Sequence, residues 1–336
     1  MTVARARLAG LALIGLAGGA GAQAPPARGA APLPASALAV RAGDGWRVWW
    51  RAAEAPARWD RGDPALLAGV RWRTASPGVE WGALSLAGSG EAWRTRVILA
   101  RIDPRRVRLT LDTAFTRTMY AAWTLDRAPR DAVFAVNAGQ FLRAMPWGWV
   151  VLDGHQFLPP GHGPLAVAVA MDSSGTLHWL PADDAARRPP ARIAWAMESY
   201  PALLSDGAVP LALRAAGQGV DVAHRDARLA LGRLPDGRLL VALTRFDALG
   251  GALGEIPFGL TVPEMAGLMG ALGCRDAVLL DGGISAQMLV RDTTGATRAW
   301  HGVRKVPMAL VGRERGDREQ GAGIREQAPR AQLPDP

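Results

Sequence analysis

Apolar residues occur along most of the chain in short runs, and turn-forming pairs separate the runs. Apolar runs of about four to eight residues that end at turn signals are typical of strands. Asp153-Gly154, Asp206-Gly207 and Asp236-Gly237 are such signals. The pattern predicts strands over residues 70–73, 97–102, 107–112, 132–136, 149–152, 165–170, 176–180, 192–197, 202–204, 228–231, 239–245 and 306–311. Because most spacings are short, we expect hairpin connections and largely antiparallel or mixed sheets.

One helix is signalled clearly. Thr261 and Glu264 form a capping box at its start, and Gly273 marks its end. The apolar face repeats with helical spacing at Met265, Leu268, Met269 and Leu272. Residues 116–127 predict a second, shorter helix. Together these elements predict an α+β fold, a single domain of mixed, largely antiparallel sheets with a few packed helices.

The predicted helix leads into an apolar run, residues 277–280, that ends in Asp281, Gly282 and Gly283. The run predicts a buried strand, and the paired glycines allow positive φ and a close approach of a ligand to the backbone. Asp281 would then lie at the mouth of a pocket. The alternative is a tight hairpin in which Asp281 only forms the turn.

The two ends of the chain have different compositions from the rest. Arg5 and Arg7 precede an apolar core over residues 8–17 and then small residues up to Ala22, the layout of a secretory signal peptide. We expect cleavage after Ala22, no integral membrane segment in the mature protein, and a periplasmic or secreted location. The remaining regions are predicted as a Pro/Ala-rich linker and Trp-containing segment (23–68), one domain (69–313) and a disordered tail (314–336).

Charge and cysteine content exclude two other classes. The net charge is +9 and the pI about 11.1, but Lys305 is the only lysine and the arginines are scattered. A solvated surface explains this pattern better than nucleic-acid binding, so no nucleic-acid partner is expected. Cys274 is the only cysteine. An intramolecular disulfide and a zinc site built from cysteines are therefore excluded.

Five stretches resemble, in order, the phosphodiester glycosidase family. They are AVNAGQF (135–141), ESYPALLSDG (198–207), ARLALGRLPDGRLLVAL (227–243), TVPEMAGLMGALGCRDAVLLDGGISAQM (261–288) and RKVPMALV (304–311). The resemblance spans about residues 69–313. Ile284 and Ala286, which follow the paired glycines, depart from the usual family pattern, as do Ala138 and Gln140 in the first stretch and residues 244–247 after the Arg228 strand.

The resemblance implies a set of site residues. Family members line the active-site cleft with the residues that match Asn137, Arg228 and Asp281 to Gly283, and Ser285 matches a serine that usually follows the glycines. We take Asp281, Glu198 and Arg228 as catalytic candidates. The candidates for substrate binding are Asn137, Gly139, Gly282, Gly283, Ser285 and Arg304.

The chemistry of a sugar-1-phosphodiester suggests how these residues act. Arg228, or secondly Arg304, would hold the phosphate, because a guanidinium binds two phosphate oxygens while it stays charged. Asp281 and Glu198 would act at the anomeric carbon, and the glycine N–H groups would cradle an anion. Trp147 and Trp149 would stack on a sugar ring or pack in the core.

The sequence thus predicts an exported hydrolase that cleaves a sugar-1-phosphodiester in cell-envelope or exopolysaccharide material. The alternative is a non-catalytic factor that binds or assembles envelope glycans and keeps the pocket. We expect no cofactor, and no group of residues has the spacing of metal ligands. The sequence does not predict an oligomeric state.

Overall fold

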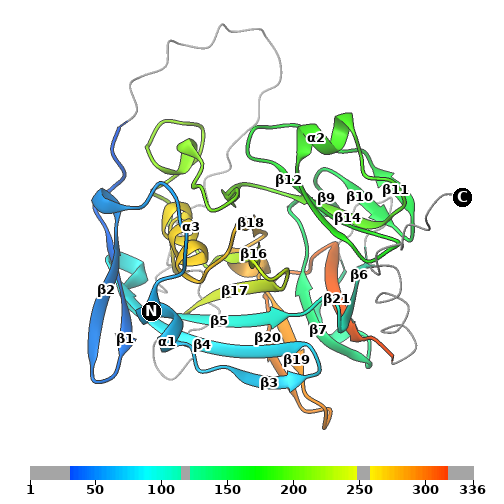
Figure 1. Cartoon of the computed structure of the whole chain (residues 1–336), viewed down its shortest axis with the longest axis horizontal. Coiled ribbons are helices and arrows are strands. Elements are labelled where there is room, and N and C mark those ends of the chain that lie inside the picture. Colours follow the sequence, from blue (N-terminus) through cyan, green and yellow to red (C-terminus); the bar gives the residue numbers. More distant parts are fainter. Residues whose placement is uncertain (1–30, 115–121, 248–257, 317–336) are drawn as a thin grey trace, which may run out of the picture.

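The computed structural model describes residues 31–114, 122–247 and 258–316 (Figure 1). The predicted signal peptide, residues 116–121 of the second predicted helix and most of the predicted tail lie outside these residues.

A large sheet runs through the molecule, and its strand order is β15-β18-β16-β17-β5-β4-β1-β2, with β3 paired to β4 (Figure 1). Every pairing in this sheet is antiparallel. Its strands are β1 (Ala37–Ala42), β2 (Gly45–Arg51), β3 (Arg73–Ser76), β4 (Val79–Gly88), β5 (Thr95–Ile102), β15 (Ala202–Leu204), β16 (Leu229–Arg233), β17 (Leu239–Phe246) and β18 (Asp276–Leu280).

Two five-stranded sheets and a two-stranded ribbon complete the strand pairing. One sheet has the order β11-β10-β14-β12-β13, formed by β10 (Val150–Leu152), β11 (His155–Leu158), β12 (Val167–Asp172), β13 (Leu177–Pro181) and β14 (Ile193–Ser199). The other has the order β20-β19-β7-β21-β6, formed by β6 (Val107–Thr113), β7 (Ala132–Asn137), β19 (Met288–Arg291), β20 (Thr297–Trp300) and β21 (Met308–Glu314). The ribbon pairs β8 (Phe141–Leu142) with β9 (Met145–Pro146).

The helices are short: α1 (Pro64–Gly69), α2 (Ala182–Arg187) and α3 (Val262–Ala271). All residues of α3 are buried, and the helix packs against β15 and β16 (Figure 1). Thr261 and Glu264 form the predicted capping box. These contacts hold the start of α3 beside the ends of β16 and β18.

The central sheet is buried on both faces, which explains the nearly continuous apolar runs in its strands. Leu229 and Leu231 of β16 face a core shared with the two five-stranded sheets. Ala230, between them, faces a second core that includes α1, α3 and the β1–β2 hairpin. The strands are thus fixed in register by packing on two sides, and a one-residue slip would exchange the two faces.

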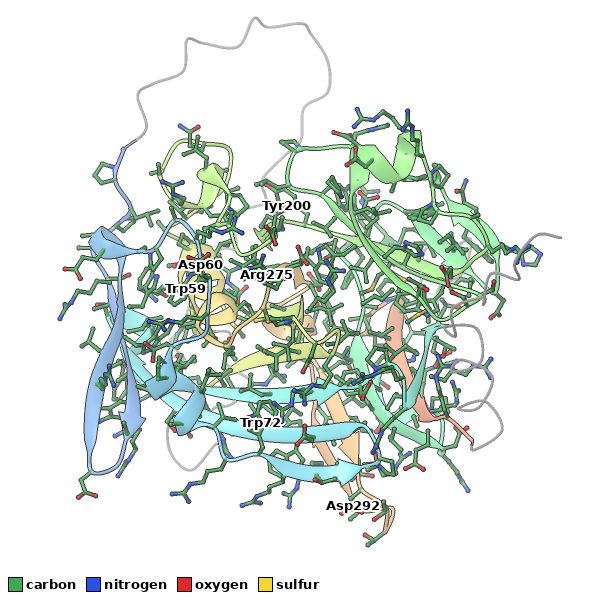
Figure 2. All side chains as sticks on the ribbon, viewed as in Figure 1. Trp59, Asp60, Trp72, Tyr200, Arg275 and Asp292 are labelled. Carbon is green, nitrogen blue, oxygen red and sulfur yellow. The ribbon has the colours of Figure 1, made fainter. Side chains whose placement is uncertain are left out.

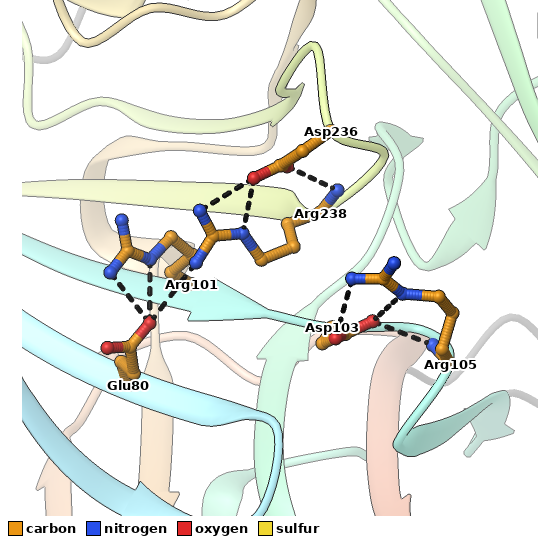
Figure 3. Close-up of polar contacts among 6 residues, drawn as sticks. All are labelled: Glu80, Arg101, Asp103, Arg105, Asp236 and Arg238. Carbon is orange, nitrogen blue, oxygen red and sulfur yellow. Dashed lines mark hydrogen bonds and ion pairs between the residues drawn. The ribbon is translucent and has the colours of Figure 1, made fainter. Parts of the chain in front are cut away.

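A network of ion pairs lies at the end of this sheet that is opposite to the start of β16. Arg101 Nη2 lies 2.7 Å from Glu80 Oε2, and Arg238 lies 3.4 Å from the same carboxylate and 2.6 Å from Asp236 (Figure 3). Arg105 pairs with Asp103 at 2.9 Å. Arg101, Arg105 and Arg238 are therefore each held by a carboxylate.

The fold confirms the prediction of largely antiparallel sheets with few helices, and the class is rich in strand. The strand predicted over residues 70–73 is wrong, because α1 ends at Gly69 and β3 begins only at Arg73. Asp63 caps α1 by accepting from the N–H groups of Ala65 and Leu66, a signal that the apolar pattern does not contain.

Two further segments differ from their predictions. No strand was predicted in the Trp-containing segment, but residues 37–51 form the β1–β2 hairpin, and Leu38 to Val40 pair with β4. In the described part of the second predicted helix, a 3-10 turn, Leu125–Arg127, replaces the α-helix.

Within the described ranges, the helices are all too short or too polar to cross a lipid bilayer.

Candidate active site

A cleft of about 460 Å³ opens where the central sheet, α3 and the loop after β14 meet. Tyr200, labelled in Figure 2, lies on the connection from β14 to β15, and so between the five-stranded and the nine-stranded sheet. The polar groups that line the cleft are Gln140, Trp147, Tyr200, Asp221, His224, Asp226, Arg228 and Asp281. Arg228, Asp281 and Gly282, three of the predicted site residues, therefore share one cavity.

Asp281 directly follows the last residue of β18, and its backbone is fixed at two atoms. Its N–H donates to the Gly139 carbonyl at 2.9 Å, and its carbonyl accepts from Asn137 Nδ2 at 2.9 Å. Asn137 Oδ1 in turn accepts from Gln287 N at 2.9 Å. Asn137 is buried and lies outside the lining of the cleft, so in this structure it orients the Asp281 turn.

The paired glycines let this turn pack against the segment before β16. A Cβ at Gly282 would lie 2.5 Å from the Ala227 carbonyl oxygen, and one at Gly283 would lie 2.9 Å from Asp226 Oδ2. Gly283 has a φ of 56° and donates its N–H to the Ala227 carbonyl at 2.7 Å. Because that N–H is used within the protein, Gly283 does not offer it to a ligand as predicted.

The segment before β16 forms the opposite wall of the cleft. Asp226 pairs with Leu260 through two backbone hydrogen bonds of 3.2 and 3.0 Å. Arg225 holds this segment to α3, since its guanidinium contacts the buried Glu264 carboxylate at 2.5 and 2.7 Å. Because alternate side chains of an extended segment point to the same side, Asp226 and Arg228 both line the cleft.

Arg228 is held in place by carbonyl groups and not by a carboxylate. Its Nε donates to Leu260 O at 2.9 Å and its Nη2 to His224 O at 2.7 Å, which leaves Nη1 without an acceptor among the described residues. Burial lowers the pKa of Arg228, while Asp226 and Asp221 raise it. A guanidinium in this setting stays charged and has donors to spare for an anion.

Asp226 and Asp281 form a pair of carboxyl groups at the cleft, and both have raised pKa values. Burial is the main cause in each case. Ser285 and Arg304 lower the pKa of Asp281, whereas the neighbouring charge of Asp226 raises it further. Asp281 Oδ2 is buried without a hydrogen-bond partner in the described residues. Two like charges in a buried site favour a state in which one carboxyl group keeps its proton.

Glu198, the predicted second carboxylate, lies in a different place. It is fully buried in β14, and its Oε2 accepts from Trp149 N at 3.0 Å and from Gly161 N at 2.8 Å. Gly148 and Gly161 close over it, since a Cβ on either would lie within 2.7 Å of the carboxylate. Glu198 is absent from the lining of the cleft, so the structure does not bring it together with Arg228 and Asp281.

The other predicted binding residues surround the Asp281 turn. Ser285 is buried and acts on Asp281 through its hydroxyl. Gly139 has a φ of 67°, and its carbonyl accepts from Asp281. Arg304 is exposed, lies 5.1 Å from the Phe141 ring and donates to the Arg143 carbonyl at 3.2 Å. Arg304 thus acts on Asp281 through its charge, from outside the cleft lining.

Aromatic rings form one side of the cleft. Trp147 and Tyr200 both line it and meet edge to face, with ring centroids 6.3 Å apart. Gln140 connects the two residues, because its side-chain Nε2 donates to the Tyr200 carbonyl and its backbone carbonyl accepts from Trp147 N. Trp149 is only 2% exposed and belongs to the core. Of the two predicted stacking residues, Trp147 alone reaches the cleft.

The sequence prediction missed Asp226, and with it Asp221, His224 and Tyr200. Asp226 stands two residues before Arg228 in the sequence His224-Arg225-Asp226-Ala227-Arg228. Alternate residues of an extended segment point the same way, so an Asp-x-Arg pattern at the start of the predicted strand was the available signal. The prediction began that strand at Arg228 and did not use it.

The arrangement combines an arginine with free donors, two coupled carboxyl groups and an aromatic wall. Such a site can bind an anion and transfer protons beside it. In the parts of the chain that the structure describes, no cluster of His, Cys, Asp and Glu side chains has the arrangement of a metal site.

Comparisons with known proteins identify a family and a similar fold. A model of the phosphodiester glycosidase family matches residues 130–312. The catalytic domain of zebrafish N-acetylglucosamine-1-phosphodiester alpha-N-acetylglucosaminidase, solved in a form auto-inhibited by its pro-peptide, is similar in fold. That comparison has a TM-score of 0.55 at 17% identity and covers 78% of this chain and 96% of the zebrafish domain.

A hypothetical protein from Synechocystis is more distant, with a TM-score of 0.46 at 16% identity over 83% of this chain and 68% of that protein. No curated protein matches this sequence significantly. The family match begins at residue 130, so residues 69–129, which the sequence resemblance included, lie outside it.

Proposed function

Because the chain belongs to the phosphodiester glycosidase family, we propose that it is an exported hydrolase that cleaves a sugar-1-phosphodiester in this cleft. The observation that carries the proposal is the meeting of Arg228 with the Asp226 and Asp281 carboxyl groups in one cavity of about 460 Å³. Export follows from the signal-peptide pattern at residues 1–22, and it suggests cell-envelope or exopolysaccharide material as the source of the substrate.

In the proposed complex, Arg228 binds the phosphate through Nη1 and the second hydrogen of Nη2. Carbonyl acceptors already hold its Nε and one Nη2 hydrogen, so the guanidinium is oriented before the substrate arrives. The sugar ring packs against Trp147 and Tyr200. The scissile C1–O bond then lies between the arginine and the two carboxyl groups.

The two carboxyl groups divide the proton transfers between them. The ionised member accepts a proton from the attacking water as the water oxygen bonds to C1. The protonated member donates its proton to the departing phosphate oxygen as the C1–O bond breaks. The products are a free sugar and a phosphate monoester, and the pair ends with the same total of one proton.

We assign the proton donor to Asp281 and the proton acceptor to Asp226. Asp281 Oδ2 is buried and has no donor among the described residues, which favours its protonated form. Asp226 accepts from the Ala227 N–H at 2.7 Å and lies beside Arg228 and His224, which favour its charged form. Glu198 then has a supporting role, because its carboxylate accepts hydrogen bonds from the two loops that cover it.

The test is the release of both products from a panel of sugar-1-phosphodiesters. We expect the wild type to release free sugar and phosphate monoester in equal amounts from at least one of them. Arg228→Gln and Asp281→Asn should release neither product at a comparable rate, because each removes one member of the cleft constellation.

The same panel distinguishes the alternative function. If the wild type cleaves nothing but retains envelope glycans in a pull-down, the protein is a glycan-binding factor that keeps the family pocket. In that case Arg228→Gln should still weaken retention, since the pocket would bind the same phosphate.

A further inference from the structure

A second cavity, of about 730 Å³, lies on the same sheet as the cleft but is not part of it. It opens where β1 separates from β4: Leu38 to Val40 pair with β4, whereas Arg41 and Ala42 do not. The exposed edges of both strands line it, together with residues of α1. The cavity is therefore built from the hairpin, the helix and the sheet edge.

Four arginines line this cavity: Arg41, Arg47, Arg71 and Arg96. All four are exposed, and none has an ion pair or a side-chain hydrogen bond to a residue in the described ranges. Asp247 is the one acidic residue in the lining. Arginines at the opposite end of β4, β5 and β17 are paired with Glu80, Asp103 and Asp236 (Figure 3). The four arginines of the cavity thus differ from Arg101, Arg105 and Arg238, each of which is held by a carboxylate.

The register of the sheet places this end beside the cleft. Arg228 accepts at its carbonyl from Thr244 N, Thr244 pairs with Val97, and the next residue, Arg96, pairs with Ser85 in the cavity lining. Neighbouring strands lie about 4.8 Å apart, so two strand spacings, about 10 Å, separate the backbones of Arg228 and Val97. Because side chains alternate across a strand, Arg96 lies on the opposite face of the sheet from Val97 and Arg228, so an extended ligand that contacts both arginines passes around the start of β5.

An aromatic ladder connects the two sites. Phe246 lies between Trp93 and Phe258, with ring centroids 6.0 and 5.6 Å apart, and it directly precedes Asp247 of the cavity lining. Phe258 stands two residues before Leu260, the residue whose carbonyl holds Arg228. Trp93 is 50% exposed and Phe258 39%. Exposed rings beside unpaired arginines suit a ligand that alternates sugar rings with negative charges.

We propose that the ladder and the four-arginine cavity bind further units of a phosphodiester-linked glycan whose terminal sugar-1-phosphodiester occupies the cleft. The inference rests on the proposed function and names its substrate class as a polymer. The rings of Trp93 and Phe258 pack against sugar units, and Arg41, Arg71 and Arg96 pair with the phosphates of units beyond the cleavage site. Because these contacts are made equally before and after bond cleavage begins, they lower KM and leave kcat to the cleft.

The first measurement is binding, in full-length protein with Asp226→Asn so that the probe is not cleaved. The probe is a fluorescent phosphodiester-linked oligosaccharide, followed by anisotropy over a range of salt concentrations. The combined variant R41Q/R71Q/R96Q should bind it at least about tenfold more weakly and with a smaller salt dependence, because three exposed charge contacts are lost. Arg188→Gln, an exposed arginine at the end of α2, is the matched control and should bind as the parent does.

The second measurement compares a polymeric with a single-unit sugar-1-phosphodiester in the active protein. R41Q/R71Q/R96Q should raise KM for the polymer about tenfold more than KM for the single-unit substrate. Trp93→Ala should act in the same direction. A merely structural role for these residues would instead change both substrates, and the melting temperature, alike.

Two results would overturn the inference. One is equal binding of the oligosaccharide by the parent and by R41Q/R71Q/R96Q. The other is equally tight binding of a single-stranded DNA of the same charge, which would show a general attraction to polyanions. If the wild type hydrolyses neither substrate, the proposed reaction is wrong, and the anisotropy measurement alone then decides whether the cavity binds the glycan.

Discussion

Glu198 and Asp281 are two carboxylates that look alike in sequence but differ in their surroundings. Both lie at the end of a strand and beside two glycines: Gly148 and Gly161 pack against Glu198, and Gly282 and Gly283 follow Asp281 in the chain. The Glu198 carboxylate is sealed under Gly148 and Gly161 and accepts two backbone N–H groups. Each carboxylate has one buried oxygen without a partner in the described residues, Glu198 Oε1 and Asp281 Oδ2, but only Asp281 of the two lines the cleft and faces the like charge of Asp226.

The difference shows what separates a supporting carboxylate from a reacting one. A carboxylate that accepts N–H groups holds a loop and is stabilised by it. A carboxyl group that is desolvated beside a like charge is held at a cost in stability, which is typical of functional sites. The two groups should therefore respond in opposite ways when each is made neutral.

Replacing Asp226 by Asn should have the largest effect. The amide is close in shape but cannot accept a proton, so kcat should fall by about 10³, within the range for loss of a general base. Turnover of a sugar-1-phosphodiester under saturating substrate measures this effect. The melting temperature should not fall, and a variant that keeps more than a tenth of the wild-type kcat would remove Asp226 from the reaction.

A smaller loss of rate should follow from Gly282→Ala. The new Cβ would meet the Ala227 carbonyl oxygen at 2.5 Å, so the turn that carries Asp281 must shift. A displacement of about 1 Å in a catalytic group lowers rates by about 10². Gly45→Ala, where a Cβ meets nothing within 4 Å, is the control and should leave kcat unchanged.

Glu198→Gln should act on stability. Both N–H groups donate to Oε2, so the amide oxygen can keep them, but the NH₂ group then takes the place of Oε1, which is buried without a partner in the described residues. A buried donor without an acceptor should make unfolding easier by about 1–3 kcal/mol. Chemical denaturation at neutral pH measures the change, and kcat per folded molecule should fall less than about tenfold. Unchanged stability would show that Glu198 does not hold its two loops.

Asp281→Asn should have the smallest effect on stability, and the effect should be in the opposite direction. Burial raises the pKa of Asp281 in the folded state, so between its ordinary pKa of about 3.9 and the raised value the folded protein binds more protons than the unfolded chain. The contribution of Asp281 to stability therefore falls as pH rises through that window. The amide removes this penalty and should stabilise the protein at pH 7 by about 0.5–2 kcal/mol.

The pH dependence separates this cause from a general packing effect. Denaturation at pH 3.5 and at pH 7 should show that the advantage of Asp281→Asn shrinks at the lower pH, where the wild-type carboxyl group is protonated in both states. An advantage of the same size at both pH values would mean that charge is not its source.

The sequence predicted those parts of the fold that depend on local signals. Three features depend only on residues close in sequence: the capping box at Thr261, the apolar face of α3 and the buried run before Asp281. Each was found where it was expected. The β1–β2 hairpin was missed because its pairing with β4 is a long-range contact that the pattern does not encode. The strand expected over residues 70–73 was wrong for a different reason, since the Asp63 cap that starts α1 is a local signal outside the apolar pattern.

For the site, the sequence located the Asp281 turn but not its partners. Arg228 and Gly282 share the cleft with Asp281, and Asn137 and Gly139 hold its backbone. The Asp-x-Arg pattern could have placed Asp226 beside Arg228, but its proximity to Asp281 depends on how the segment before β16 packs on the glycine turn. Glu198 was wrongly grouped with Asp281, because its carboxylate is covered by the loops after β9 and β11, and the sequence does not show that these loops fold over it.

The most direct test of the account is one comparison of turnover per folded molecule, Asp226→Asn against Glu198→Gln, on the sugar-1-phosphodiester that the wild type cleaves best. The account predicts that Glu198→Gln loses less than about tenfold in kcat and has reduced stability, whereas Asp226→Asn loses about 10³ in kcat without loss of stability. An active Asp226→Asn together with a stably folded but inactive Glu198→Gln would contradict it, because the reacting carboxylate would then be the sealed one.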